Sequence, residues 1–160
     1  MGVGKGTTAR AFTKKYGTYI IDTDDLIESK EKREVKKIFE KKGEAYFREQ
    51  EQMTANWIEK CVTGTFISCG GGFYKVDNLK KLGTVVLLDA SFEWIHNRLK
   101  TAKNAEAKLA KRPLFADEKK AKALYKERKK AYKALADVVV NVEKLTLEEQ
   151  LEAIAKKCKM

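Results

Sequence analysis

The stretch MGVGKGTT, residues 1–8, decides the fold of this 160-residue chain. It is the second half of a phosphate-binding loop, whose full pattern is a glycine, four residues, Gly-Lys and then Ser or Thr. Glycines let successive backbone N–H groups turn toward one anion, and the helix that follows points its positive N-terminus at the same place. The lysine adds a full charge that can follow the β- and γ-phosphates into the transition state. Residues 1–8 taken alone therefore indicate nucleotide binding, with a flexible glycine-rich tail as an equal alternative.

This loop departs from the full pattern at two places. Position 6 is Gly6 rather than Ser or Thr, which displaces the hydroxyl by one residue to Thr7. The first glycine and the strand that normally delivers the loop would lie before residue 1. We favour a start assigned at an internal methionine over a truncated or a partner-dependent protein. We expect the 160-residue chain to be poorly stable and weakly active, and a form longer by roughly ten residues to be normal.

The composition excludes several classes of protein. Hydrophobic residues make up 43% of the chain, which argues against disorder, and no apolar run or signal-peptide pattern indicates a membrane span or secretion. The three cysteines lack metal-ligand spacing and are expected to be reduced thiols of a cytosolic protein. The net charge of +11 suits an anionic partner, either nucleic acid or a phosphorylated small molecule. Because no aromatic-basic motif is present, a solvated lysine-rich surface is favoured.

Four short apolar runs predict strands that are buried on both faces, with helical patterns between them. The strands are expected at 18–22, 65–69, 84–88 and 137–142, and the helices at 7–16, 35–42, 44–61, 92–100, 118–135 and 146–157. Strands that alternate with helices predict one α/β domain with a parallel sheet. The polar segment around Pro113 reads as a mobile excursion, where a nucleotide enzyme would carry a lid.

Two motifs offer carboxylates and an arginine for chemistry. Residues 22–25 (DTDD) follow the first strand, at the sheet edge where ligands bind in open α/β folds. One of Asp22 and Asp24 could orient Mg²⁺ and the other could accept a proton, although a helix N-cap is favoured for this motif taken alone. Arg48 and Glu51 are i,i+3 neighbours, so Glu51 could orient the guanidinium toward a carboxylate, but for this pair taken alone a surface ion pair is expected.

Three further features complete the candidate site. The glycines of residues 70–72 follow the second strand and would let a ligand approach the backbone closely. Arg112 precedes Pro113 and could fold over the phosphates to stabilise developing charge. Arg128 lies in the long helix 118–135 and is a candidate second ligand for a carboxylate, with a solvated arginine as the default.

The order of these motifs along the chain resembles the shikimate kinase family over essentially all 160 residues. The resemblance implies an α/β, three-layer P-loop fold with a parallel sheet in the order 2-3-1-4-5, whose strand 1 is absent from this chain. It implies one domain, with a substrate-binding subdomain at about 23–61 and a lid at about 101–116. It also implies that ATP, with Mg²⁺, phosphorylates the 3-hydroxyl of shikimate on the route to chorismate and the aromatic amino acids. The implied enzyme is a cytoplasmic monomer without nucleic-acid or membrane partners.

The same resemblance implies a role for each candidate residue. The catalytic residues would be Lys5 on the transferring phosphate, Asp24 as the base and Arg112 in the lid. The residues that bind ATP would be Gly2, Gly4, Lys5, Gly6, Thr7, Thr8 and Arg112. The residues that bind shikimate would be Asp24, Arg48, Gly70, Gly71, Gly72 and Arg128, the two arginines taking its carboxylate. The Mg²⁺ ligands would be Thr7 and Asp22.

Three other functions stay open from the sequence. The run Gly-Lys-Gly-Thr at residues 4–7 also resembles adenylate kinase and its relatives, and a gluconate-type kinase is a further option on the same fold. The DTD motif, the triple glycine and the short lid argue against both. From a different class, the chain could be a non-catalytic nucleotide- or RNA-binding protein that uses its charge, and steeply salt-sensitive binding to oligonucleotides would support that.

Overall fold

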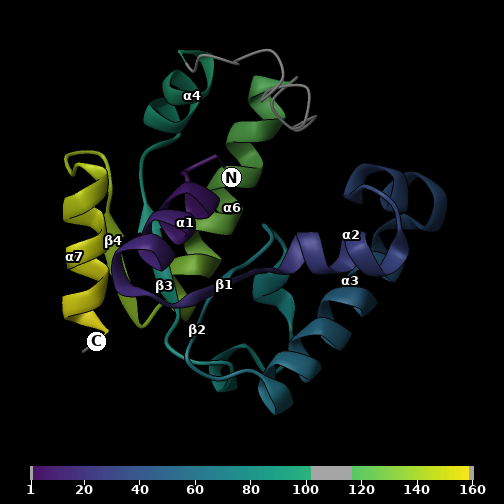
Figure 1. Cartoon of the computed structure of the whole chain (residues 1–160). Coiled ribbons are helices and arrows are strands. Elements are labelled where there is room, and N and C mark those ends of the chain that lie inside the picture. The colour runs from purple at the N-terminus through teal and green to yellow at the C-terminus, as the bar shows by residue number, and fades with distance from the viewer. Residues whose placement is uncertain (1, 102–116, 159–160) are drawn as a thin grey trace. The chain divides into compact units, whose positions relative to one another are not determined.

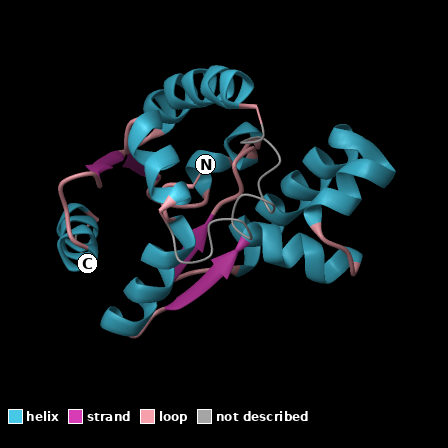
Figure 2. Ribbon diagram, turned by 90° about the horizontal axis from the view of Figure 1, so that it is seen from above, coloured by secondary structure: helices cyan, strands magenta, loops and turns pink. Residues whose placement is uncertain are grey.

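The computed structural model of the chain describes residues 2–101 and 117–158 (Figure 1). These residues belong to two compact units, one of Lys5–Val85 and one of Met1–Gly4 with Val86–Met160. Each unit contains a two-stranded parallel sheet with helices beside it (Figure 2). The predicted α/β class with parallel strands is therefore confirmed. The lid expected at 101–116 lies, apart from Thr101, outside the described residues.

In the unit Lys5–Val85, the two strands bring their carboxyl ends to one edge. β1 (Tyr19–Asp22) pairs in parallel with β2 (Thr65–Ser68), and Asp22 lies level with Ser68. The residues that directly follow the two strands, 23–25 and 69–72, therefore leave the sheet side by side. The other elements of this unit are α1 (Lys5–Tyr16), α2 (Thr23–Glu31), α3 (Val35–Cys61) and two short 3₁₀ turns, η1 (Phe73–Lys75) and η2 (Leu79–Lys81).

Two apolar clusters hold α3 in this unit. Near its start, Ile38 and Phe47 pack with Ile27 of α2. Near its end, the cluster of Ala55, Ile58, Phe73 and Val76 joins α3 to η1 and to the partly buried Ile67 of β2. Burial of such side chains supplies about 1.5–3 kcal/mol each, so α3 is held along most of its length. The middle of α3, between the two clusters, carries Arg48 and Glu51.

Gly43 breaks α3 in the manner that the sequence predicts. Its backbone has φ 81° and ψ 173°, a conformation that is essentially restricted to glycine, and helical residues lie on both sides of it. The expected helices at 35–42 and 44–61 are therefore two halves of α3 that change direction at one residue. Apart from its chain neighbours and the backbone of its own helix, no atom of the described residues lies within 4 Å of where a Cβ on Gly43 would stand.

The second unit is built on β3 (Val86–Asp89) and β4 (Val138–Asn141), again parallel, with Asp89 level with Asn141. Its helices are α4 (Phe92–Lys100), α6 (Glu118–Leu135) and α7 (Leu147–Lys157). Thr146 caps α7 in a capping box with Glu149, as the sequence predicts. Gly2 lies against Ile95 and Leu99 of α4, and Gly2 and Gly4 of the phosphate loop belong to this unit.

Most expected elements are confirmed, and the differences have local causes. The bounds of α4 and α6 agree with the sequence, whereas α1 begins two residues earlier than expected, at Lys5. Helix α2 has no counterpart among the helices expected from the sequence, although a helix N-cap is the favoured interpretation of residues 22–25 taken alone. That interpretation is confirmed: Asp22 is the N-cap of α2, and its Oδ1 accepts from the Asp24 N–H at 3.0 Å. The three cysteines are free thiols, and among residues 2–101 and 117–158 no helix is long and apolar enough to cross a membrane.

Gly43→Ala tests the backbone break. We expect the free energy of unfolding to fall by about 1–3 kcal/mol, because alanine is strained at this φ and ψ while no neighbour obstructs its methyl group. Urea denaturation followed by circular dichroism measures this. Lys41→Ala, at an exposed helical position two residues earlier, is the control and should change stability by less than about 0.5 kcal/mol. Equal stability of Gly43→Ala and the parent chain would contradict the assigned break.

Candidate active site

The candidate site of the unit Lys5–Val85 starts where β1 and β2 end. Asp22 closes β1, Thr23 and Asp24 form the first turn of α2, and Gly70 lies just beyond β2. The Thr23 side chain is fully buried, and its Oγ1 accepts a hydrogen bond from the Gly70 N–H at 2.9 Å. This bond ties the glycine segment to the start of α2. Asp24 and the glycines are thereby held at the same edge of the sheet.

Two glycines make room for the two charged side chains of this site. A Cβ on Gly70 would overlap the carboxylate of Asp24, and a Cβ on Gly72 would overlap the guanidinium of Arg48. Neither glycine has a positive φ, so the backbone itself does not require glycine at these positions. The requirement is steric: Asp24 and Arg48 both lie directly against the backbone that follows β2. Glycines in this segment therefore let functional groups pack closely.

Arg48 is held by two carboxylates of its own helix. Its Nη1 donates to Glu51 Oε2 at 2.5 Å, while its Nη2 and Nε donate to Glu44 Oε1 at 2.8 and 3.1 Å. Glu51 is 1% exposed, so the expectation of a surface ion pair is wrong. The interpretation in which Glu51 orients the guanidinium agrees with this geometry. A guanidinium has five N–H donors, so Arg48 has donors beyond these three bonds with which to bind an anion.

Asp24 has a strongly perturbed acidity. Its pKa is raised from the ordinary value of 3.8 to about 6, first because burial disfavours the charged carboxylate, and further because Asp22 and Glu51 repel it. Lys5 opposes this effect, since its positive charge lowers the pKa of Asp24. A carboxylate with a pKa near 6 is still ionised at pH 7–8 and accepts a proton more readily than an ordinary one. This is the property that a general base needs.

The phosphate loop has the glycine conformations that the sequence pattern implies. Gly2 and Gly4 have φ of +64° and +103°, values that favour glycine. A Cβ on Gly4 would overlap the guanidinium of Arg98, whose Nη1 donates to the Val3 carbonyl at 2.5 Å. Arg98 also lies 5.2 Å from the Trp94 ring centroid, in cation–π contact. Arg98 of α4 therefore supports the backbone of the loop, a contact that the sequence did not indicate.

The rest of the loop leads into α1. Lys5 is the first residue of this helix, and its charge acts on both Asp24 and Cys69. Thr7 is exposed, whereas Thr8 is 2% exposed and faces the interior. Of these two hydroxyls, the Thr7 hydroxyl is thus the one open to a ligand. A Cβ placed on Gly6 would lie 3.3 Å from Nη1 of Arg10.

Ten of the fourteen predicted site residues belong to the unit Lys5–Val85. Those that lie around the ends of β1 and β2 and the start of α1 are Lys5, Asp22, Asp24, Arg48, Gly70 and Gly72. Gly2, Gly4 and Arg128 belong to the other unit, and Arg112 lies outside the described residues. The sequence analysis missed Thr23 and Glu44 as supporting residues. Thr23 stands inside the DTD motif, which was a usable signal, while Glu44 could have been found as the i−4 neighbour of Arg48.

Comparison with known proteins gives one consistent result. The family model described as shikimate kinase matches residues 1–159. A shikimate kinase of Helicobacter hepaticus is 37% identical over 148 residues, covering 92% of this chain and 86% of that protein. One of Sulfurihydrogenibium is 38% identical over 165 residues, covering 99% and 93%. The solved shikimate kinase of Acinetobacter baumannii in complex with shikimate has a TM-score of 0.83 and 27% identity, covering 98% of this chain and 87% of that one.

Asp24→Asn is expected to stabilise the protein at neutral pH. The difference between 3.8 and about 6 means that holding Asp24 ionised in the folded state costs roughly 3 kcal/mol above pH 6. Because the folded state binds this proton more tightly than the unfolded state, the cost is absent below pH 3.8 and grows as the pH rises to 6. Thermal unfolding of Asp24→Asn and the parent chain at pH 4 and pH 7.5 measures it.

Asp25→Asn is the matched control for this measurement. Asp25 is the next residue in the same helical turn and is exposed. Its substitution removes only a favourable interaction of a carboxylate with the helix N-terminus, so it should destabilise slightly at pH 7.5. A stabilising effect of Asp24→Asn that is equal at both pH values, or no effect at all, would contradict the assigned pKa.

Proposed function

The chain belongs to the shikimate kinase family, and we propose that Asp24 is the base of its reaction, the ATP-dependent phosphorylation of the 3-hydroxyl of shikimate. The products are shikimate 3-phosphate and ADP, in the pathway to chorismate and the aromatic amino acids. The observation that supports Asp24 most directly is its half-buried carboxylate, which lies against Gly70 and has a pKa of about 6. As the 3-hydroxyl attacks the γ-phosphorus, its proton passes to Asp24. Phosphoryl transfer needs little more from a base than this, because positioning and charge stabilisation dominate.

ATP binding rests on the phosphate loop. In the proposal, the loop backbone of Gly2, Gly4 and Gly6 presents N–H groups to the phosphates, and Lys5 adds a positive charge at the N-terminus of α1. Thr7 and Thr8 complete the nucleotide-binding set. Arg112 is proposed as the lid arginine that stabilises charge on the transferring group. Lys5 has a second effect, since its charge keeps Asp24 from becoming still more basic.

Shikimate recognition is proposed to rest on paired opposite charges. Shikimate carries one carboxylate and several hydroxyls, and a guanidinium binds a carboxylate through two parallel hydrogen bonds. Arg48, oriented by Glu44 and Glu51, supports this role. Arg128 is proposed as the second carboxylate ligand. Asp24 would bind the hydroxyls, and the backbone of Gly70, Gly71 and Gly72 would line the pocket.

Mg²⁺ is proposed to be held by Asp22 and Thr7, and when bound it would neutralise charge on the phosphates. Among the described residues, no group of three or more His, Cys, Asp or Glu could hold a metal ion. Magnesium in kinases takes most of its ligands from phosphates and water, so one carboxylate and one hydroxyl fit it. The Oδ1 atom of Asp22 accepts the Asp24 N–H, and the other oxygen of the carboxylate is the candidate ligand. Gly6 offers no side-chain oxygen.

The remaining parts of the proposal concern class and partners. Membership of the family favours shikimate over the nucleoside monophosphates and gluconate that the loop alone left open. A small-molecule substrate also favours a kinase over a protein that binds RNA. We further propose a single-domain monomer that works in the cytoplasm without nucleic-acid partners, with residues 23–61 as its substrate-binding part.

Release of ADP from ATP and Mg²⁺, with and without shikimate, tests the function. We expect turnover that requires shikimate and a kcat/KM that rises with pH and levels off above about 6, as Asp24 ionises. Asp24→Asn should lower kcat by roughly 10²- to 10⁴-fold. Asp25→Asn, one residue further and exposed, should leave kcat within a factor of two. Turnover that persists in Asp24→Asn would remove Asp24 as the base, and AMP- or gluconate-dependent turnover would overturn the substrate.

Gly72→Ala tests the placement of Arg48. The alanine methyl group would overlap the guanidinium and displace it, so we expect the KM for shikimate to rise on the order of tenfold while the KM for ATP stays the same. Gly72 has φ −104° and ψ −9°, which alanine tolerates, so the backbone is not strained. Lys75→Ala, an exposed change in the following turn, is the control. Unchanged affinity for shikimate in Gly72→Ala would contradict the role of Arg48.

A further inference from the structure

Two adjacent basic residues of α6 have opposite surroundings. Arg128 is half-buried, and within residues 2–101 and 117–158 no hydrogen bond or ion pair involves its guanidinium. Lys129, the next residue, is surrounded by acceptors. In the sequence the two look alike, as basic residues on one lysine-rich helix. Their environments indicate that one is available to a ligand and that the other is used to hold the helix.

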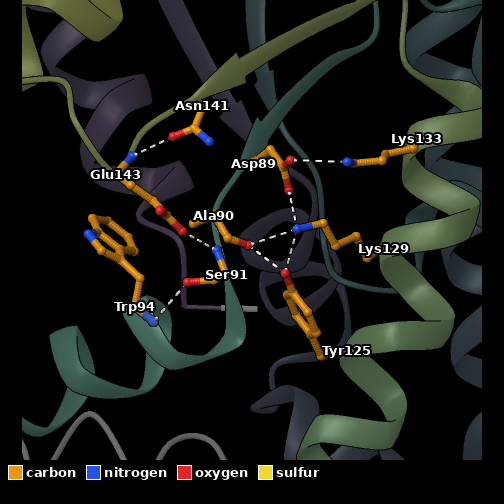
Figure 3. A network of polar contacts seen from close by, with 9 residues as sticks. All are labelled: Asp89, Ala90, Ser91, Trp94, Tyr125, Lys129, Lys133, Asn141 and Glu143. Carbon is orange, nitrogen blue, oxygen red and sulfur yellow. Dashed lines mark hydrogen bonds and ion pairs between the residues drawn. The ribbon is translucent and has the colours of Figure 1, made fainter.

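The ammonium group of Lys129 has three oxygen partners in one place (Figure 3). It lies 2.9 Å from Asp89 Oδ1, donates to the Tyr125 hydroxyl at 2.8 Å, and donates to the Ala90 carbonyl at 3.4 Å. The Tyr125 hydroxyl in turn donates to the same carbonyl at 2.5 Å. An ammonium group has three N–H donors, and here each of them has an acceptor. Lys129 therefore has no donor left for a substrate.

These contacts fix one face of α6 to the end of β3. Tyr125, Lys129 and Lys133 follow each other at i,i+4 spacing, and Lys133 lies 3.4 Å from the second carboxylate oxygen of Asp89. The Asp89 side chain is 14% exposed, so two ammonium groups offset the cost of taking its charge out of water. A helix that is fixed along one stripe by charged and aromatic contacts cannot rotate about its axis without breaking them.

The anchoring point on β3 is itself held by β4. The Asp89 carbonyl accepts from the Val142 N–H at 3.0 Å, and the Ser91 N–H donates to the carboxylate of Glu143. Figure 3 shows the contact between Ser91 and Glu143 on the side of this segment away from α6. The segment 89–91 thus makes hydrogen bonds to the residues that follow β4 on one side, and an ion pair and hydrogen bonds to α6 on the other. Its position does not depend on α6 alone.

We propose that Lys129 is a positioning residue that orients Arg128 for the carboxylate of shikimate. Side chains one residue apart on a helix point about 100° apart, so the stripe of Tyr125, Lys129 and Lys133 sets the direction of Arg128. The guanidinium is then aimed before the substrate arrives, which reduces the entropy cost of binding. This inference rests on the proposed role of Arg128 as a carboxylate ligand.

Steady-state kinetics of four variants test the inference. We expect Lys129→Met, which keeps the length of the side chain, to raise the KM for shikimate on the order of tenfold and to leave the KM for ATP unchanged. Arg128→Ala should raise the same KM at least as much. The double variant should be no worse than Arg128→Ala alone, because Lys129 acts through Arg128. Lys130→Met, an exposed position on the same turn, is the control and should change neither KM.

Two further variants separate positioning from loss of fold. A smaller amount of folded enzyme lowers the apparent kcat and leaves both KM values unchanged. A rise in the KM for shikimate without a rise in the KM for ATP therefore identifies positioning. Lys129→Arg keeps the ion pair with Asp89 and should recover much of the affinity for shikimate. Where Lys129→Met does not stay folded at the assay temperature, Asp89→Asn removes the same ion pair with little change of shape and should raise the KM for shikimate likewise.

The outcomes separate this inference from the proposed function. If Arg128→Ala raises the KM for shikimate but Lys129→Met does not, positioning by Lys129 is overturned and the carboxylate ligand stands. Positioning is also overturned if the two losses multiply in the double variant, since independent residues behave in that way. If Arg128→Ala leaves the KM unchanged, the role of Arg128 in carboxylate binding fails, and the inference fails with it.

Discussion

The ion pair between the half-buried Arg48 and the buried Glu51 is the constraint on which the substrate side of this protein depends. A carboxylate that is 1% exposed is costly unless a positive charge compensates it, and Arg48 does so at 2.5 Å. Because apolar clusters hold α3 near both of its ends, the positions of Glu51 and Arg48 on this helix are fixed relative to the strands of the same unit. The guanidinium then occupies the space beside Gly72, so the chain after β2 must lack a side chain there. One charge pair thus sets requirements on a helix and on the segment that follows a strand.

The same logic governs Asp24, with a different result. Asp24 is also packed against a glycine, Gly70, but its closest charged neighbours include two acidic residues and one lysine. Burial and repulsion therefore raise its pKa, and Lys5 opposes part of the rise. Glu51 has a direct cationic partner and serves as support, whereas Asp24 is kept ionised at a cost in stability. Active sites commonly carry such a cost, since a carboxylate whose charge is strongly stabilised has a low pKa and is a poor base.

The other unit uses a carboxylate at a strand end for a structural purpose. Asp89 closes β3 as Asp22 closes β1, and both stand at the carboxyl edge of a parallel pair. Asp22 caps α2 through the Asp24 N–H, while Asp89 holds Lys129 and Lys133 of α6. Both sheets therefore carry an aspartate at the end of their first strand. The residues around each aspartate decide whether it caps a helix, anchors a helix or faces a ligand.

The amino-acid sequence by itself determined most of the helices and strands and their order, although not α2. Apolar runs and caps depend on residues close together in the chain, which is why α4, α6, the capping box at Thr146 and the break at Gly43 agree with expectation. The order of the motifs was enough to indicate the family. Only the tertiary structure decided that Glu51 is buried, that Asp24 has a raised pKa, and that Lys129 pairs with Asp89 whereas Arg128 has no such partner among the described residues. Burial and electrostatic pairing depend on residues distant in the chain, and no local pattern encodes them.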